Sequence, residues 1–220
     1  MWNNRHSKKR NIIGILAMQG SGKSALMQYL LLINPKSCII FDPVGSLQPY
    51  KNRVFVDFEK QSVKKILNKI GRRFYSQKID IVINNCNNIE SVLGLIYNNL
   101  TNICIVIDEI DIEYKAYIPN DNYLYKICNF GRHKEIDLIG VARRPANMPR
   151  ILTSQSNYLF LGNSNQEPLD LKYIREFVDK KTYNNYLNLS KYSFLCYNTA
   201  EHSSNYLKLP LKALDKLNIQ

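Results

Sequence analysis

The apolar positions of the chain fall into short β-branched runs that alternate with longer stretches of helical period. Near-continuous apolar runs are typical of parallel strands that are covered on both faces. The predicted strands span residues 11–16, 37–41, 79–83, 103–107, 136–141 and 158–161, and the predicted helices span 23–32, 61–70, 89–100 and 123–129. This order predicts an α/β fold with a mostly parallel central sheet flanked by helices.

The pattern changes towards the C-terminus. Helical stretches are expected over 170–178 and 181–189, and possible strands over 192–197 and 205–209. No repeat, linker or low-complexity block interrupts the chain. We therefore expect a single domain over residues 11–220, preceded by a basic N-terminal tail over residues 1–10.

The segment AMQGSGKS, residues 17–24, lies between the first predicted strand and the first predicted helix. It matches the phosphate-binding pattern G-x-x-x-x-G-K-[ST], known as Walker A, in its last three places. Ala17 stands where the pattern has glycine, and a methyl group fits there if φ stays negative. Lys23 would contact the β- and γ-phosphates, and the Ser24 hydroxyl would bind Mg²⁺. The expected nucleotide-binding residues are Gly20, Ser21, Gly22, Lys23, Ser24 and Ala25.

Two acidic residues, Asp108 and Glu109, follow the apolar strand at residues 103–107. In this Walker B arrangement Asp108 would hold Mg²⁺, and Glu109 would polarise the water that attacks the γ-phosphate. Asp111 and Glu113 are expected to form a solvated edge. A small-molecule kinase does not need the water-activating glutamate, and the nearest string to the guanine motif N-K-x-D, NKIG at 68–71, lacks its aspartate. The pair therefore favours ATP hydrolysis.

The net charge of the chain predicts a second class of partner, in addition to the nucleotide. The chain has 220 residues, with 30 Lys and Arg against 18 Asp and Glu, which gives a formal net charge of +12. Such a charge favours DNA, RNA or an anionic surface as a partner, although a lysine-rich bias of the source genome gives the same count. The five scattered cysteines include no C-x-x-C pair and indicate free thiols in a reducing compartment. No apolar run is long enough for a membrane span, so a cytoplasmic protein is expected.

Several further motifs, in their order along the chain, resemble those of a known protein superfamily. They are FDPVG at 41–45, FGRHK at 130–134 and GVARRP at 140–145, beside the Walker A segment and IVIDE at 105–109. Over residues 11–165 this series resembles the FtsK/HerA superfamily of DNA-pumping ATPases, and most of all its viral genome-packaging branch. The resemblance implies a RecA-like (ASCE) P-loop fold, ATP and Mg²⁺ as cofactors, and a homo-oligomeric ring of five or six subunits around double-stranded DNA.

The resemblance also implies roles for two arginines. Arg143 stands where the family commonly has a sensor glutamine, and its guanidinium can donate to a phosphate oxygen but cannot accept a proton. Arg143 and Arg144 are expected to face the γ-phosphate of their own chain. Arg132 matches the family arginine that reaches a neighbour's nucleotide, although a solvated basic turn is an equal interpretation there. Asp42 matches a family turn, and a plain turn explains it equally well.

Together these features predict an ATP-hydrolysing translocase that packages a viral double-stranded DNA genome into a capsid. Such a motor would dock on a capsid or portal-vertex protein and work in the host cytoplasm or on the virion. The alternatives are a nucleotide or nucleoside kinase, a plasmid-transfer or phage-assembly ATPase, and a nucleic-acid-binding module whose P-loop no longer works.

Overall fold

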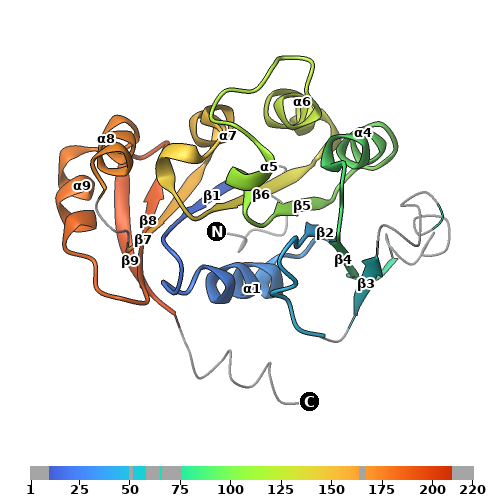
Figure 1. Cartoon of the computed structure of the whole chain (residues 1–220), viewed down its shortest axis with the longest axis horizontal. Helices are drawn as coiled ribbons and strands as arrows, with labels where there is room; N and C mark the ends of the chain where they lie inside the picture. The colour runs from blue at the N-terminus through green and yellow to red at the C-terminus, as the bar shows by residue number, and fades with distance from the viewer. Residues whose placement is uncertain (1–9, 50–51, 58–64, 66–75, 164–166, 210–220) are drawn as a thin grey trace.

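A nine-stranded sheet forms the centre of the computed structural model, which describes residues 10–49, 52–57, 65, 76–163 and 167–209 (Figure 1). The strand order is β3-β4-β2-β5-β6-β1-β7-β8-β9. All neighbours from β3 to β7 are parallel, and β8 and β9 add to the β7 edge as antiparallel strands. The strands are β1 (Ile12–Leu16), β2 (Cys38–Phe41), β3 (Arg53–Asp57), β4 (Asp80–Asn84), β5 (Cys104–Ile107), β6 (Asp137–Ala142), β7 (Tyr158–Gly162), β8 (Ser193–Asn198) and β9 (Ser203–Lys208).

Helices cover both faces of this sheet. In Figure 1, α1 lies on one face, α4, α6 and α7 lie on the other, and α8 and α9 lie beside β7, β8 and β9. The helices are α1 (Lys23–Ile33), α4 (Ile89–Asn99), α5 (Ile110–Glu113), α6 (Tyr123–Phe130), α7 (Arg150–Gln155), α8 (Pro168–Phe177) and α9 (Lys180–Leu187), with short 3-10 turns η1 (Gly131–Lys134) and η2 (Pro145–Asn147). Within the described residues no helix is long and apolar enough to cross a bilayer.

The predicted α/β fold with a mostly parallel sheet is confirmed, and every predicted strand is present with shifts of one or two residues at its ends. The expected helix over 61–70 lies outside the described residues. Sequence patterning missed β3, α5 and α7, which have five, four and six residues. The two helices span only one or two turns, which is too short for a helical period, and β3 has an apolar run of only three residues between Arg53 and Asp57.

Two hydrophobic layers follow from the alternation of side chains along each buried strand. Ile13 and Ile15 pack with Leu26 and Met27 of α1 on one face. Ile12 and Leu16 join a larger cluster on the other face, which includes residues of α4, α6, α7, α8 and α9. Both faces are covered, so the strands read as continuous apolar runs.

Local capping explains where several helices begin. Asn88 accepts a hydrogen bond from the Ser91 N–H at 2.9 Å, and Asn122 accepts one from the Leu124 N–H at 2.9 Å. Asp179 caps α9 in the same way. Helix α1 differs, because it begins after Gly22, has no side-chain cap and has no acidic residue in its first turn. Its first N–H groups are therefore left for another acceptor.

The N-terminal boundary has a structural residue where the sequence predicts a tail. Residues 1–9 lie outside the described part, but Arg10 is half-buried against the end of α6. Its guanidinium donates to the Cys128 carbonyl at 2.9 Å, to the Ile136 carbonyl at 2.7 Å and to the Ile127 carbonyl. Arg10 therefore joins the last turn of α6 to the residue that precedes β6. The cysteines are free thiols, as expected, and Cys38, Cys104 and Cys128 are buried.

Candidate active site

Three chain segments meet at the carboxyl edge of the parallel sheet. Strand β6 lies between β1 and β5, with Leu16 opposite Ala142 and Ile107 opposite Gly140. The loops that follow β1, β5 and β6 therefore leave the sheet side by side, because parallel strands end at the same edge. They carry the Walker A segment, the Walker B acids and Arg143, respectively.

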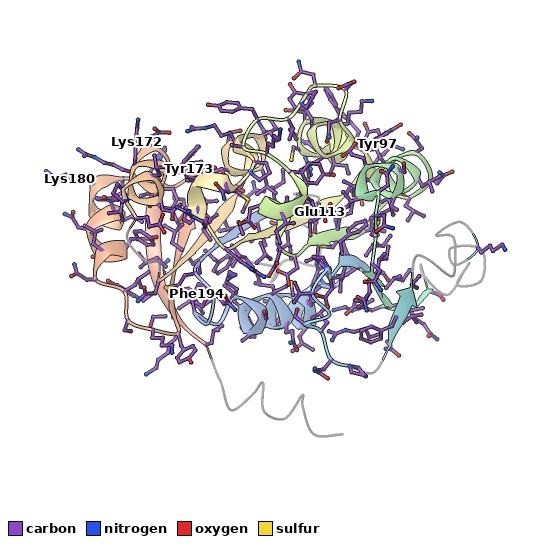
Figure 2. All side chains as sticks on the ribbon, viewed as in Figure 1. Tyr97, Glu113, Lys172, Tyr173, Lys180 and Phe194 are labelled. Atoms are coloured by element: carbon purple, nitrogen blue, oxygen red, sulfur yellow. The ribbon has the colours of Figure 1, made fainter. Side chains whose placement is uncertain are left out.

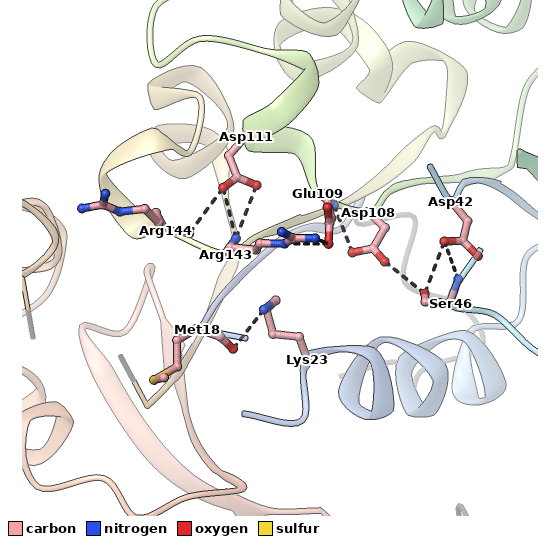
Figure 3. Close-up of polar contacts among 9 residues, drawn as sticks. All are labelled: Met18, Lys23, Asp42, Ser46, Asp108, Glu109, Asp111, Arg143 and Arg144. Carbon is pink, nitrogen blue, oxygen red and sulfur yellow. Dashed lines mark hydrogen bonds and ion pairs between the residues drawn. The ribbon is translucent and has the colours of Figure 1, made fainter. Parts of the chain in front are cut away.

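The loop after β1 is a tight turn around the Met18 carbonyl oxygen. That oxygen accepts a hydrogen bond from the Ser21 hydroxyl at 2.6 Å. It also accepts one from the Lys23 ammonium at 3.0 Å (Figure 3). Gly20 and Gly22 have φ values of 73° and 95°, a region that side chains with a Cβ rarely adopt. The glycines at these positions therefore allow the turn.

The start of α1 offers free hydrogen-bond donors. Among the described residues, no backbone carbonyl accepts from the N–H groups of Gly22, Lys23, Ser24 or Ala25. Ser24 is exposed. Unpaired N–H groups at a helix N-terminus, with the positive end of the helix dipole behind them, form a binding site for phosphate. This arrangement agrees with the prediction for Gly22, Lys23, Ser24 and Ala25, whereas the N–H and hydroxyl of Ser21 donate to the Met18 carbonyl instead.

Ala17, the departure from the Walker A pattern, is fully buried. It is absent from the residues with positive φ, so it meets the condition under which alanine fits. Gly162 of β7 lies across from it, where an added Cβ would come within 2.6 Å of the Ala17 methyl. The Ala17 methyl group thus fills the space that the first glycine of the Walker A pattern would leave empty. The glycine at this contact is Gly162, on the neighbouring strand.

The C-terminal hairpin reaches the phosphate loop from the other side. A Cβ added to Gly22 would lie 3.4 Å from the Tyr192 ring, 3.5 Å from Leu209 and 3.8 Å from the Phe194 ring. Figure 2 shows Phe194 beside the first turn of α1. Tyr192 has φ 62° and is 43% exposed. The antiparallel hairpin of β8 and β9 therefore packs against the phosphate loop.

Asp108 is buried at the end of β5 beside a second carboxylate. The Ser46 hydroxyl lies 3.3 Å from Asp108 Oδ2 and 3.3 Å from Asp42 Oδ1, so it bridges the two acids. Burial, and then repulsion from Asp42 and Glu109, raises the pKa of Asp108 to about 6. Asp42 also accepts from the Ser46 and Leu47 N–H groups, so it stabilises its own turn.

The Asp108 carboxylate and the Ser24 hydroxyl are oxygen donors of the kind that bind a divalent cation beside a phosphate. Mg²⁺ prefers carboxylate, hydroxyl and water oxygens, and a bound cation would offset the repulsion that raises the pKa of Asp108. Asp108 and Ser24 are the residues that would hold it. When bound, Mg²⁺ supplies charge neutralisation for the phosphate oxygens.

Glu109 is paired with Arg143. Arg143 Nε donates to Glu109 Oε1 at 2.7 Å, and Nη2 donates to the same oxygen (Figure 3). Glu109 adopts a left-handed conformation with φ 52°, and its Oε2 atom is buried without a hydrogen-bond partner among the described residues. The arginine predicted to face the phosphate is thus held by the proposed water-activating residue.

Lys23 lies among these charges. Burial lowers the pKa of Lys23, while Asp108, Glu109 and Asp111 raise it and Arg143 lowers it further. These interactions, together with Figure 3, place Lys23 next to the Walker B acids and Arg143. The site therefore brings together residues from three separate loops.

Asp111 has a structural role that the sequence interpretation did not give it. Its carboxylate accepts from the Arg143 N–H at 3.3 Å and from the Arg144 N–H at 3.4 Å, and so joins α5 to the loop after β6. The expectation that Arg144 faces the γ-phosphate is wrong. Its side chain pairs with Glu167 and with Asp170, the latter at 3.4 Å, and points away from Lys23 (Figure 3).

Arg132 is not part of this cluster. It lies in η1, which precedes β6, and therefore stands at the opposite edge of the sheet from the phosphate loop. It is exposed, as is His133, and Lys134 lies 5.3 Å from the centre of the Tyr97 ring. Arg132 cannot reach the nucleotide loop of its own chain.

Sequence reasoning missed Met18, Ser46 and Asp111. Met18 acts through a main-chain carbonyl, for which side-chain patterns give no signal, and Ser46 and Asp111 act on partners that lie on other loops. Only Asp111 gave a usable signal, as a third acid two residues after the Walker B pair.

The fold and the site define a P-loop nucleoside triphosphatase architecture. No protein-family model matches the chain, and no curated protein matches it significantly. Solved structures, in contrast, do match the chain. The genome packaging NTPase B204 from Sulfolobus turreted icosahedral virus 2, in complex with AMPPCP, superposes with a TM-score of 0.73 at 19% identity, over 90% of this chain and 97% of that chain.

Two further structures share the fold. VirB4 of Thermoanaerobacter pseudethanolicus gives a TM-score of 0.65 at 12% identity, over 96% of this chain and 93% of that chain. The N-terminal domain of zonular occludens toxin from Neisseria meningitidis gives 0.51 at 14% identity, over 94% and 98%. The fold implied by the resemblance to the FtsK/HerA superfamily is confirmed.

Proposed function

We propose that this chain is an ATPase that moves double-stranded DNA, and that it packages a viral genome. The observation that carries the proposal is the meeting of Lys23, Asp108 and Glu109 beside free N–H donors at the start of α1. Phosphate binding, cation binding and water activation each have a residue there. Glu109 would orient the attacking water, and Lys23 would stabilise charge on the transferred phosphoryl group.

Hydrolysis is favoured over a kinase reaction because a buried carboxylate, Glu109, has an oxygen with no protein partner beside Lys23. Such an oxygen can accept a hydrogen bond from water. ATP turnover measured with and without duplex DNA tests the function. Stimulation by DNA supports a motor, whereas phosphate transfer to an added nucleoside or nucleotide supports a kinase.

DNA as the partner is supported by the net charge of +12 and by the fold shared with the packaging NTPase. Contacts would be mainly to phosphate groups, so binding should weaken steeply with salt and show little base preference. Binding isotherms at several salt concentrations, on duplexes of different sequence, test this. A footprint on one sequence that does not change with salt would contradict it.

A transfer ATPase is the second candidate, because VirB4 has the same fold. The two functions use the same nucleotide site and differ in what the motor docks on. A packaging motor would bind a capsid or portal-vertex protein of its own virus. Filling of empty capsids with DNA, dependent on ATP and on Lys23, separates the two.

A ring is proposed because Arg132 is exposed at the sheet edge opposite its own phosphate loop. From there it could complete a neighbour's site, which is worth roughly 10³-fold or more in hydrolysis for an arginine supplied in trans. Mixing inactive subunits tests this. Lys23→Ala subunits should rescue Arg132→Ala subunits but not Arg143→Ala subunits, whose defect lies in the site that binds ATP. Rescue of neither, in mixed rings shown to form, would remove Arg132 from the site.

A further inference from the structure

Arg143 and Glu109 form an ion pair between two groups that the proposed hydrolysis needs for different purposes. Arg143 Nε lies 2.7 Å from Glu109 Oε1, and Nη2 donates to the same oxygen. In the proposed reaction Glu109 must hold the attacking water. Arg143 follows β6 and lies close enough to Lys23 to lower the pKa of Lys23. While the pair exists, these two guanidinium donors are not available to a phosphate.

The two partners differ in freedom to move. The Glu109 side chain is 10% exposed, whereas the Arg143 side chain is 39% exposed. The main chain of Arg143 is fixed, because its N–H donates to Asp111. A change of partner therefore requires only rotation of the arginine side chain, with the backbone of both residues kept in place.

A triphosphate supplies a competing partner. The terminal phosphate of ATP carries more negative charge than a carboxylate and has three acceptor oxygens, so it attracts a guanidinium more strongly in a partly buried site. A diphosphate lacks the γ-phosphate, so it offers the guanidinium no such competing partner. The pair would therefore respond to the one feature that separates ATP from ADP.

We propose that Arg143 exchanges Glu109 for the γ-phosphate when a nucleoside triphosphate binds, and that this exchange is how the site distinguishes triphosphate from diphosphate. The inference rests on the proposed ATPase function. In the empty site Arg143 occupies Oε1 of Glu109. After the exchange both carboxylate oxygens are available to the attacking water.

The test is a comparison of binding, not of turnover. Dissociation constants for Mg-ADP and Mg-AMPPCP are measured by calorimetry for the unmodified chain, Glu109→Gln, Arg143→Met and the double variant. The quantity compared is the ratio Kd(ADP)/Kd(AMPPCP), because damage to the phosphate loop affects both nucleotides and cancels. Glu109→Gln should raise this ratio, since the triphosphate analogue no longer has to displace a charged partner.

Part of that rise comes simply from removing a negative charge near the phosphates. The same substitution made in the Arg143→Met background measures this part alone. We expect the rise to be at least about fivefold larger when Arg143 is present, the worth of a partly exposed ion pair. Glu176→Gln is the matched control, because it removes the same charge from an exposed ion pair between Glu176 of α8 and Arg150 of α7, 2.9 Å apart. It should leave the ratio unchanged.

Equal rises in both backgrounds, or a fall with Glu109→Gln, would overturn the exchange. If Arg143→Met does not fold, Arg143→Lys keeps the charge without the planar fork and should reduce the coupling between the two positions. If the binding ratios refute the exchange while DNA still stimulates ATP turnover, only the exchange is wrong and the proposed motor function stands. An intact exchange without DNA-stimulated turnover would refute the motor instead, and no nucleotide binding by the unmodified chain would refute both.

Discussion

Asp108→Asn should stabilise the protein in the absence of metal and nucleotide. Asp108 is 5% exposed, and its pKa is raised from 3.8 to about 6. The ionised carboxylate is therefore less stable in the folded chain than in the unfolded one. A rise from 3.8 to about 6 corresponds to about 3 kcal/mol of destabilisation when the group is fully charged.

The sign depends on pH. The penalty is fully present above about pH 6, where Asp108 is ionised in the folded chain, and it fades as the pH falls towards 3.8. Asparagine is neutral throughout and keeps an oxygen that can accept from the Glu109 N–H, 3.0 Å away. At pH 8 the substitution should raise the free energy of unfolding by up to about 3 kcal/mol, and at pH 4 by well under about 1 kcal/mol.

Urea unfolding in EDTA, at pH values from 4 to 8, measures this difference. Asp179→Asn is the control of opposite sign, because hydrogen bonds from Thr182 lower the pKa of Asp179. Ionised Asp179 stabilises the folded chain, so this variant should lose stability above about pH 4 rather than gain it. No gain for Asp108→Asn at pH 8, or an equal gain at pH 4 and pH 8, would refute the reasoning.

Four other predictions follow from the same contacts. Lys23→Ala should abolish ATP turnover, because it removes the ammonium beside the Walker B acids; unchanged turnover at saturating Mg-ATP would refute the site. Glu109→Gln should keep nucleotide binding but lower turnover by roughly 10²-fold or more, measured by phosphate release. Gly22→Ala should cost about 1–2 kcal/mol in urea unfolding, since φ is 95°, a conformation that strains a residue with a Cβ even though the added methyl would have room. Arg10→Met should cost about 2–3 kcal/mol in the same assay, because it leaves half-buried carbonyls unpaired; an unchanged midpoint would show that water satisfies them.

The sequence by itself determined the fold class and predicted the phosphate loop. Both depend on neighbours along the chain. The parallel strands can be predicted because each is buried on both faces and so forms a continuous apolar run. The Walker A loop can be predicted because its strand, glycines and helix are contiguous in residues 12–33. The Walker B acids were predicted for the same reason, since they directly follow β5.

Tertiary structure alone decided which charged side chains meet. Arg143 and Arg144 are adjacent in sequence, yet Arg143 pairs with Glu109, 34 residues away, and Arg144 turns to Glu167, 23 residues away. The Ser46 bridge to Asp108 and the Arg10 contacts with α6 span 62 residues and more than 100 residues, respectively. Hydrophobic periodicity fixes which face of an element is buried, but it does not encode the partner of a polar group. That partner is chosen when β6 is placed between β1 and β5 and the loops at their carboxyl ends come within hydrogen-bonding distance.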